Sequence, residues 1–285
     1  MRPVAPHRVL EWGRANLREL PWRATREPWP VLVSEVMAQQ TPIDRVVPKW
    51  RAFLSAWPDP AACASAELSE VLAMWSGLGY PRRARDLHAS ATVIVEQHGG
   101  GVPADRDALL ALPGVGPYTA AAVMAFAFEA DVAVVDTNVA RVLARVAGRR
   151  LGAAEARRSA ADLVPSGQGW WWNQTLMEIG ARCCRPRSPR CEGCPLAPGC
   201  EWFSAGRPDP DPAVGSALVS GRQERFEGSN RQVRGRVMAE LVDGPVPLDE
   251  LVARLGVDAA RARQVVEGLV DDRLVTITSG RVRLG

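Results

Sequence analysis

The chain has 285 residues, of which 47% are hydrophobic, and its formal net charge is only +3. This composition suits a compact core of about two domains and excludes a polycation that binds anions by bulk charge alone. Charges interrupt every apolar stretch and residues 1–20 hold no continuous apolar core, so we expect no bilayer span, no secretory signal and a cytoplasmic protein.

Apolar residues recur at helical spacing through most of residues 1–200. The clearest stretches are VLVSEVMAQQ, AELSEVLAMWSGL, RARDLHASATVIVEQ, YTAAAVMAFAF and NVARVLARVAG. Pro and Gly breaks such as WPDP and HGGGVPAD separate them. No alternating strand pattern occurs in this part of the chain, so we expect an all-α fold here.

The first of these stretches carries a single acidic residue, Glu35, in an otherwise apolar helix. A glutamate in the middle of a helix ordinarily lies on a solvated face. A buried glutamate has a raised pKa and holds a proton near neutral pH, which suits a general acid. The residue pattern alone leaves both interpretations open.

The segment ALPGVGPYTAAAVMAF, residues 111–126, has the pattern of a tight hairpin between two helices. Gly114 and Gly116 allow the backbone to approach a ligand closely, and the N-terminus of the helix that follows suits an anion. Such hairpins grip one DNA strand by its phosphates without reading its sequence. The alternative is an ordinary packing motif between two helices.

The segment VAVVDTNVARVLAR places Asp136 after an apolar run and directly before a helix. Asp is a favoured N-cap residue, and capping keeps the carboxylate ionised. Two carboxyl groups in unlike environments can divide the roles of proton donor and of ionised carboxylate. Glu35 and Asp136, in unlike surroundings, suit these two tasks.

Five of the six cysteines lie within residues 183–200, and four follow the pattern C-x6-C-x2-C-x5-C: Cys184, Cys191, Cys194 and Cys200. In a reducing compartment, thiols this dense indicate metal binding rather than disulfides. The spacing suits a 4Fe-4S iron–sulfur cluster, and a zinc ion is the alternative. Cys183 is the spare, and Cys63 fits a small buried apolar residue. A pinned loop would present Arg185 and Arg187 to phosphates; electron transfer is the rival function.

The composition changes after residue 203, where SAGRPDPDPAVGS begins a linker predicted over residues 204–224. Residues 225–285 contain three helical patterns and then LVTITSG and RVRLG, which suit a short hairpin. This order predicts a small winged-helix-like module. Such modules bind DNA or a protein surface, and the balance of 12 Arg against 12 Asp plus Glu in residues 204–285 weakens the DNA interpretation.

The chain resembles the adenine DNA glycosylase (MutY) family of the endonuclease III, helix–hairpin–helix superfamily, over residues 7–202. The motifs that carry the resemblance occur in the family's order: VSEVMAQQT, WSGLGY, RARDLH, LPGVGPYTAAAV, VVDTNVARVLAR, NQTLMEIGA and the cysteine loop. The resemblance implies a helix–hairpin–helix glycosylase fold with a six-helix domain over residues 24–130. Residues 1–23 and 131–203 would form the iron–sulfur domain, with the active site between the two.

The resemblance also implies the activity: removal of adenine mispaired with 8-oxoguanine or guanine in double-stranded DNA, by a monomer, in the nucleoid. Glu35 would protonate N7 of a flipped-out adenine and Asp136 would stabilise the oxocarbenium ion. Tyr118 and Asn138 would orient these groups. The implied DNA contacts are Gln40, Tyr80, Gly114, Gly116, Thr119, Arg185 and Arg187.

Tyr118 decides how far the reaction goes. In bifunctional relatives a lysine at this position attacks the sugar carbon as an amine, whereas a phenol forms no Schiff base. The single lysine of the chain, Lys49, matches no motif. The hairpin carbonyls of Leu112 and Val115 are implied ligands of a monovalent cation.

Two features depart from the family pattern. Pro81 replaces the second Tyr of GLGYY, and the helical tail stands where many members carry a Nudix-like domain that recognises 8-oxoguanine. The preference for 8-oxoguanine over guanine opposite adenine is therefore open. The rival functions are a thymine glycosylase for G·T mismatches and a non-catalytic iron–sulfur DNA-binding protein.

Overall fold

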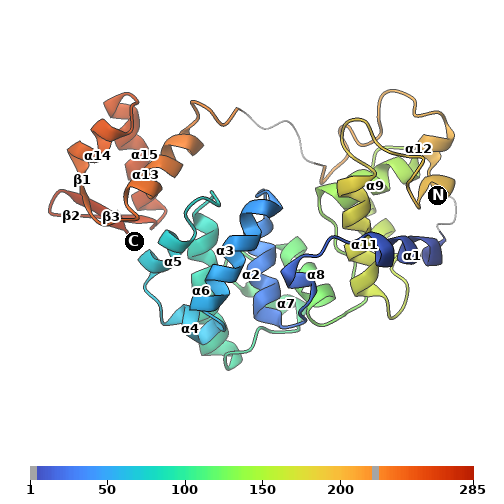
Figure 1. Cartoon of the computed structure of the whole chain (residues 1–285), viewed down its shortest axis with the longest axis horizontal. Helices are drawn as coiled ribbons and strands as arrows, with labels where there is room; N and C mark the ends of the chain where they lie inside the picture. Colours follow the sequence, from blue (N-terminus) through green and yellow to red (C-terminus); the bar gives the residue numbers. More distant parts are fainter. Residues whose placement is uncertain (1–4, 220–224) are drawn as a thin grey trace. The chain divides into compact units, whose positions relative to one another are not determined.

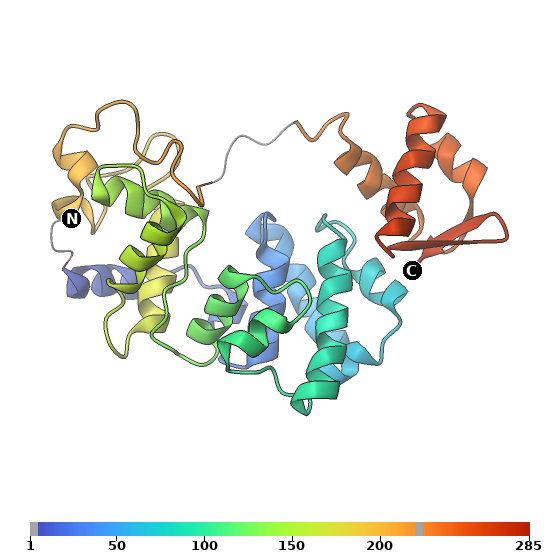
Figure 2. The same cartoon turned by 180° about the vertical axis from the view of Figure 1, so that it is seen from behind.

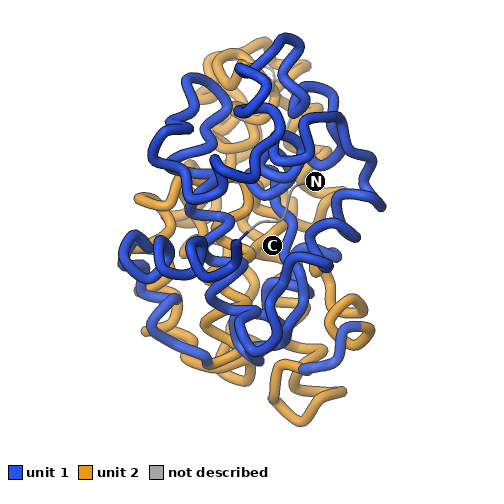
Figure 3. Tube along the Cα trace, turned by 90° about the vertical axis from the view of Figure 1, so that its right-hand side faces the viewer, with its two compact units in different colours: residues 1–26, 104–106, 116–222 blue, residues 27–103, 107–115, 223–285 orange. Residues whose placement is uncertain are grey.

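The computed structural model describes residues 5–219 and 225–285. The Cα trace divides into two compact units, shown in Figure 3. Unit 1 consists of residues 1–26, 104–106 and 116–222, and unit 2 of residues 27–103, 107–115 and 223–285. Within the described ranges no helix combines the length and the apolar character that a bilayer span requires.

All regular structure in the described part of unit 1 is helical. Its elements are α1 (Pro6–Asn16), η1 (Pro21–Arg23), α8 (Pro117–Phe126), α9 (Thr137–Ala147), α10 (Ala153–Ala161), α11 (Gly169–Arg182), η2 (Ala197–Gly199) and α12 (Glu201–Ser204). Helix α11 packs against α1, α8 and α9 (Figures 1 and 2). The apolar positions of α9 recur every three or four residues, so one stripe of the helix enters the core: Val139, Val142, Leu143 and Val146.

The first part of unit 2 is a helical bundle. Its helices are α2 (Pro28–Ala38), α3 (Ile43–Ala56), α4 (Pro60–Ala64), α5 (Leu68–Met74), α6 (Arg82–His98) and α7 (Arg106–Ala111). The first residue of α7 belongs to unit 1 and its other residues belong to unit 2. Aromatic rings fill its core: Phe53 lies 4.8 Å from Trp57 and 6.5 Å from Trp75, centroid to centroid. Cys63 is fully buried there, as expected. The all-α prediction for residues 1–200 is confirmed, because the strands of the described residues all follow residue 245.

The C-terminal module, residues 225–285, has winged-helix topology. Its elements are α13 (Asn230–Glu240), β1 (Val246–Pro247), α14 (Leu248–Arg254), α15 (Ala259–Asp271), β2 (Val275–Thr278) and β3 (Arg281–Leu284). The antiparallel sheet has the order β1-β3-β2, with Val282 of β3 opposite both Val246 and Ile277. The predicted helices and hairpin are confirmed. Strand β1 was not predicted, because two residues show no periodicity.

Part of the predicted linker is folded. Asp211 forms an ion pair with Arg145 of α9 at 2.5 Å, and Ala217 donates its backbone N–H to the carbonyl of Leu151 at 2.9 Å. The hydroxyl of Ser216 accepts the N–H of Leu151 at 3.0 Å. The linker predicted over residues 204–224 therefore contains a segment, residues 211–217, that packs on the rest of unit 1. Residues 220–224 of that expected linker lie outside the described residues.

Candidate active site

Glu35 lies in α2, whose residues are almost all buried. The helix begins with Pro28, whose fixed φ suits a first helical position. The residues that follow are so apolar that no face of the helix is left to water. Glu35 is only 7% exposed, which excludes a solvated surface glutamate. A carboxyl removed from water in this way suits a proton donor.

Two loops of unit 2 hold the residues that were expected to enter DNA. Gln40 follows α2 with φ 54°, and Tyr80 precedes α6 with φ 50°. The left-handed region is uncommon for residues other than glycine, and such strained positions cluster at functional sites. The Tyr80 side chain is exposed, at 39%.

Arg83 of α6 ties these two loops together, a role that the sequence did not reveal. Its guanidinium donates six hydrogen bonds of 2.6–3.1 Å, to the backbone oxygens of Val36, Met37, Gln39, Leu78 and Gly79 and to Oγ1 of Thr41. Its Cζ lies 5.4 Å from the ring centroid of Tyr80. Burial lowers the pKa of Arg83 to about 10, so the side chain remains charged at neutral pH. The motif RARDLH contains this arginine, but carbonyl acceptors leave no sequence pattern.

The hairpin between α7 and α8 depends on its first glycine. Gly114 has φ +73°, and a Cβ at this position would lie 2.7 Å from Cβ of Asp86. The Ser90 hydroxyl donates to the carbonyl of Pro113 at 2.6 Å and holds the turn against α6. The carbonyl of Leu112 accepts the N–H of Val115 at 3.1 Å. The expected tight turn is therefore present.

Helix α8 begins directly after this turn. Gly116 is its N-cap and Pro117 its first residue, and no side chain caps the helix. Such an N-terminus attracts anions, because the helix dipole and the first N–H groups point outward. Tyr118 is half-buried, whereas the Thr119 side chain is only 2% exposed. The hydroxyl of Thr119 therefore does not face solvent, and the contact of Thr119 with DNA stays a prediction.

In unit 1, Asp136 is the N-cap of α9. Its Oδ1 accepts the backbone N–H of Val139 at 2.7 Å, and its Oδ2 accepts Nδ2 of Asn138 at 2.8 Å. Burial raises the pKa of Asp136, and the N–H groups of Val139 and Asn138 only partly offset this rise. The two predicted residues Asp136 and Asn138 are thus in direct contact.

A hydrogen-bonded path leads from this cap to the cysteine loop. Arg141 donates Nη2 to Oδ1 of Asn138 at 2.7 Å and Nε to the backbone oxygen of Cys184 at 2.7 Å. Gly180 of α11 allows the close approach of the two helices, because a Cβ there would lie 2.6 Å from Cβ of Asn138. Neither Arg141 nor Gly180 was predicted, although both lie in the motifs VVDTNVARVLAR and NQTLMEIGA.

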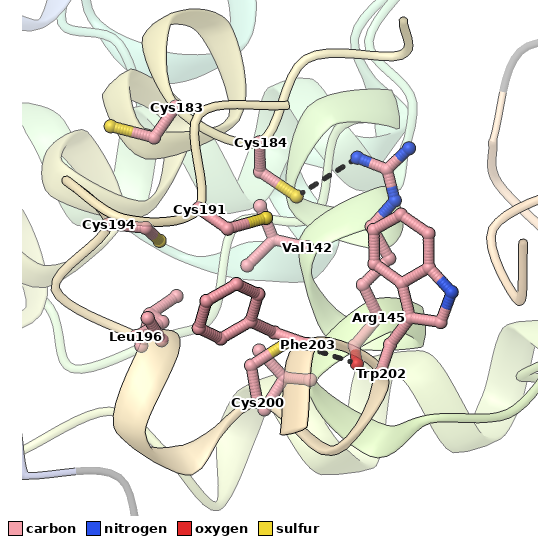
Figure 4. Close-up of a pocket in the computed structure, with 12 residues that line it drawn as sticks. Val142, Arg145, Cys183, Cys184, Cys191, Cys194, Leu196, Cys200, Trp202 and Phe203 are labelled. Carbon is pink, nitrogen blue, oxygen red and sulfur yellow. Dashed lines mark hydrogen bonds between the residues drawn. The ribbon is translucent and has the colours of Figure 1, made fainter. Parts of the chain in front are cut away.

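The five cysteines of residues 183–200 line one apolar pocket of unit 1 together with Val142, Leu196 and Phe203. All of them are free thiols. Figure 4 shows the sulfur of Cys183 pointing away from the space that the other four cysteines border. Burial raises the pKa of Cys194 to about 12. In the described ranges, no three His, Cys, Asp or Glu side chains are arranged to hold a single metal ion.

Arg145 lies beside this pocket and is almost fully buried. Its Nη1 donates to Sγ of Cys184 at 3.3 Å (Figure 4) and to the carbonyl of Arg185 at 2.8 Å. The carboxylate of Asp211 balances the charge of Arg145 and accepts hydrogen bonds from its Nε and Nη2. The Cζ of Arg145 lies 4.6 Å from the Trp202 ring centroid. The sequence did not reveal this pair, because 66 residues separate its members.

The structure thus assigns the predicted site residues to two groups. Unit 1 contains Gly116, Tyr118, Thr119, Asp136, Asn138, Arg185, Arg187 and the cysteines, and unit 2 contains Glu35, Gln40, Tyr80 and Gly114. The guanidinium of Arg185 donates to the carbonyl of Ser188 at 3.0 Å within the cysteine loop, and Arg187 is exposed.

Comparison with known proteins matches residues 33–166 to the HhH-GPD superfamily of base excision DNA repair proteins. The adenine DNA glycosylase of Mycolicibacterium smegmatis is 42% identical over 99% of this chain and 96% of its own length. A thermostable thymine-DNA glycosylase is 32% identical, with a TM-score of 0.65 over 70% of this chain and 94% of that structure. A trapped endonuclease III–DNA covalent intermediate is 25% identical, with a TM-score of 0.62 over 71% of this chain and 95% of that structure.

The resemblance to the mycobacterial enzyme extends beyond the hairpin and the cysteine loop, since the alignment includes the C-terminal module. The structural neighbours share the helical part of the fold, and one of them is bound to DNA. The chain therefore belongs to the adenine DNA glycosylase family, within the HhH-GPD superfamily of base excision DNA repair proteins.

Proposed function

We propose that this DNA glycosylase removes adenine mispaired with 8-oxoguanine or guanine and stops at the abasic site. The observation that carries the proposal is the pair of carboxyl groups held by two different helices. Glu35 is buried within the apolar helix α2, and Asp136 caps α9 and accepts hydrogen bonds from Val139 and Asn138. The first environment suits a proton donor and the second a carboxylate that stabilises positive charge.

The chemistry needs both groups at the flipped-out nucleotide. Glu35 gives its proton to N7 of adenine, so the base accepts the electron pair of the breaking C1′–N9 bond. Positive charge forms at C1′ and the ring oxygen, where the Asp136 carboxylate stabilises it. Water then adds at C1′, and its proton returns to the Glu35 carboxylate. Tyr118 orients the reacting groups and, as a phenol, forms no imine.

Extrusion of the base uses the loops of Gln40 and Tyr80, the hairpin and the cysteine loop. Gln40 and Tyr80 enter the duplex beside the orphan base and fill the gap that extrusion leaves. The hairpin glycines Gly114 and Gly116, with the N-terminus of α8, bind phosphates of one strand. Arg185 and Arg187 add phosphate contacts from the cysteine loop.

Four residues of the cysteine pocket fit a 4Fe-4S cluster: Cys184, Cys191, Cys194 and Cys200. The pocket supports this assignment, because its walls are apolar, its thiols are free, and Arg145 provides an N–H to the sulfur of Cys184. The group would pin the loop that carries Arg185 and Arg187. The carbonyls of Leu112 and Val115 would hold a monovalent cation, and the enzyme would act as a monomer in the nucleoid.

A base-release assay tests the proposed substrate. Duplexes that pair adenine with 8-oxoguanine or guanine, and thymine with guanine, are incubated with purified protein, and free base and abasic sites are measured. We expect release of adenine from the first two. Release of thymine alone would support the second candidate, a G·T mismatch glycosylase, which the 32% identical thymine-DNA glycosylase structure favours. Binding without release of any base would favour a non-catalytic protein.

A further inference from the structure

The C-terminal module is bonded to the glycosylase helices of unit 2 through one carboxylate, Asp272. This residue follows α15 as its C-cap and is only 8% exposed. Its Oδ1 accepts Arg82 of α6, its Oδ2 accepts Arg234 of α13, and its backbone oxygen accepts Arg85 of α6. One acidic residue therefore joins the start of α6 to two helices of the module.

The Asp272 contacts are favourable for two reasons. A helix C-terminus carries partial negative charge, so the Arg85 cation is well placed at the end of α15. Burial raises the pKa of Asp272, but the hydrogen bonds from Arg82 and Arg234 outweigh it and the pKa is lowered. The carboxylate is therefore charged at neutral pH, when both arginines are charged as well.

A second contact reaches the Tyr80 loop. Arg231 of α13 lies with Nη1 3.3 Å from the hydroxyl of Tyr80, and strand β3 packs against α5, the helix before this loop (Figure 1). Arg83 contacts the Tyr80 ring from within the bundle. The exposed Tyr80 is thus contacted by arginines of the bundle and of the module.

Many arginines of the module are engaged within the module. Arg261 donates to Asn230 and Gly228, and Arg263 forms an ion pair with Asp249. Arg236 donates to the carbonyl of Leu255. With the balanced charge of residues 204–285, these contacts favour a protein-docking role for the module over phosphate binding.

We propose that the C-terminal module braces the Tyr80 loop and that Asp272 is the positioning residue that holds the module in place. The inference rests on the proposed function in one respect, the entry of Tyr80 into the duplex. A Tyr80 side chain that is already held in position before DNA binds loses less conformational freedom when it enters the duplex. Asp272 would therefore support extrusion of the base, while the proton transfer from Glu35 would not depend on it.

The test compares Asp272→Asn with Asp249→Asn, which removes an exposed ion pair elsewhere in the same module. Extrusion is measured in the full-length chain by the fluorescence of 2-aminopurine, an adenine analogue, placed opposite guanine. We expect Asp272→Asn to weaken extrusion about fivefold, equal to about 1 kcal/mol, and Asp249→Asn to leave it unchanged. Hydrogen exchange of β3 and α5 should increase in Asp272→Asn only.

A double-mutant cycle with Tyr80→Phe separates positioning from a general effect on stability. The phenylalanine keeps the ring and removes the oxygen that Arg231 contacts. If Asp272 acts through Tyr80, the variant with both substitutions should extrude the base as well as the less active of the two single variants does. Additive losses, or equal extrusion by Asp272→Asn and the wild type, would overturn the inference.

A second variant and the base-release assay distinguish failure of this inference from misfolding and from failure of the proposed function. If Asp272→Asn does not fold, Arg82→Gln removes one of the two arginines and should cause a smaller loss of the same kind; normal extrusion by a folded Arg82→Gln variant would overturn the inference. Failure of the proposed function is recognised separately, because the wild type would then release no adenine in the base-release assay.

Discussion

At the scale of single residues, Glu35 and Asp136 carry the same functional group in different surroundings. The Glu35 side chain is enclosed by its own apolar helix and its neighbours, at 7% exposure. Asp136 ends an apolar run and accepts hydrogen bonds from the first turn of α9. Burial favours the protonated form of a carboxyl, and hydrogen bonds from N–H groups favour the ionised form. Burial raises the pKa of Asp136, and the hydrogen bonds from Val139 and Asn138 act against that rise and stabilise its ionised form. These donors suit Asp136 to the task of the carboxylate.

Replacement of Glu35 by Gln should abolish excision of adenine, because the amide has nearly the same shape but donates no proton of comparable acidity. Binding of the duplex should remain, since the phosphate contacts lie elsewhere. Single-turnover excision and a binding titration on the same duplex measure the two effects. Retention of a tenth of the wild-type rate, a barrier change of only about 1.4 kcal/mol, would contradict the assignment of the acid.

Replacement of Asn138 by Ala should shift the acid limb of the pH–rate profile. The ionised form of Asp136 is the active one, and its pKa is already raised by burial. Loss of the 2.8 Å hydrogen bond from Asn138 destabilises the carboxylate, so its pKa rises further and activity is lost at higher pH. We expect a shift of about one pH unit. The alkaline limb, which reports the proton donor, should not move; an unchanged acid limb would show that Asn138 does not act through Asp136.

Borohydride should trap no covalent imine between this protein and DNA, because Tyr118 has no amine. The single lysine is also engaged, with Nζ of Lys49 donating to the carbonyl of Met74 at 2.9 Å. Gel electrophoresis after incubation with an abasic-site duplex checks this expectation, with a bifunctional endonuclease III as the positive control. Efficient trapping would identify Lys49 or the terminal amine as an unrecognised nucleophile.

At the scale of the elements, the loops that hold Gln40 and Tyr80 depend on Arg83. A lysine at this position keeps the charge but cannot reach acceptors on both loops with one rigid fork. Arg83→Lys should therefore lower the free energy of unfolding by about 2–3 kcal/mol and weaken base extrusion. Thermal unfolding and 2-aminopurine fluorescence measure these losses, with the exposed Arg45→Lys as a matched control. Equal behaviour of the two variants would show that Arg83 does not support the loops.

The helices could be predicted from the sequence because their apolar periodicity is local. The stripe on α9 and the break at Leu112–Gly116 are visible within windows of a few residues. The thiol set was visible for the same reason, since its spacing is compact. Arg83, Arg145 and Asp272 could not be predicted in this way: their partners lie far away in the chain, and several of those partners are backbone carbonyls that any residue provides. The two-residue strand β1 exists only because β3 pairs with it.

At the scale of the whole molecule, the segment after the cysteine loop changes where the chain can be shortened. A flexible linker from residue 204 would allow removal of residues 204–285 without loss. The structure contradicts this, because Asp211 neutralises Arg145, whose side chain is 2% exposed and donates to the sulfur of Cys184. A buried cation without its partner is strongly destabilising.

Two truncations should therefore behave differently. Removal of residues 220–285 keeps Asp211 and should leave a brown protein that binds about four irons per chain and still releases adenine. Removal of residues 204–285 leaves Arg145 unpaired beside the pocket and should destabilise unit 1 by about 3–5 kcal/mol, with loss of iron. Iron analysis, visible absorbance and thermal unfolding compare the two, and full-length Asp211→Asn isolates the contribution of the ion pair from that of the deleted chain. If both truncations bind iron and unfold at the same temperature, Asp211 does not stabilise the cysteine pocket. If instead the longer truncation and Asp211→Asn lose iron together, a residue beyond the cysteine loop is needed to hold that loop in place.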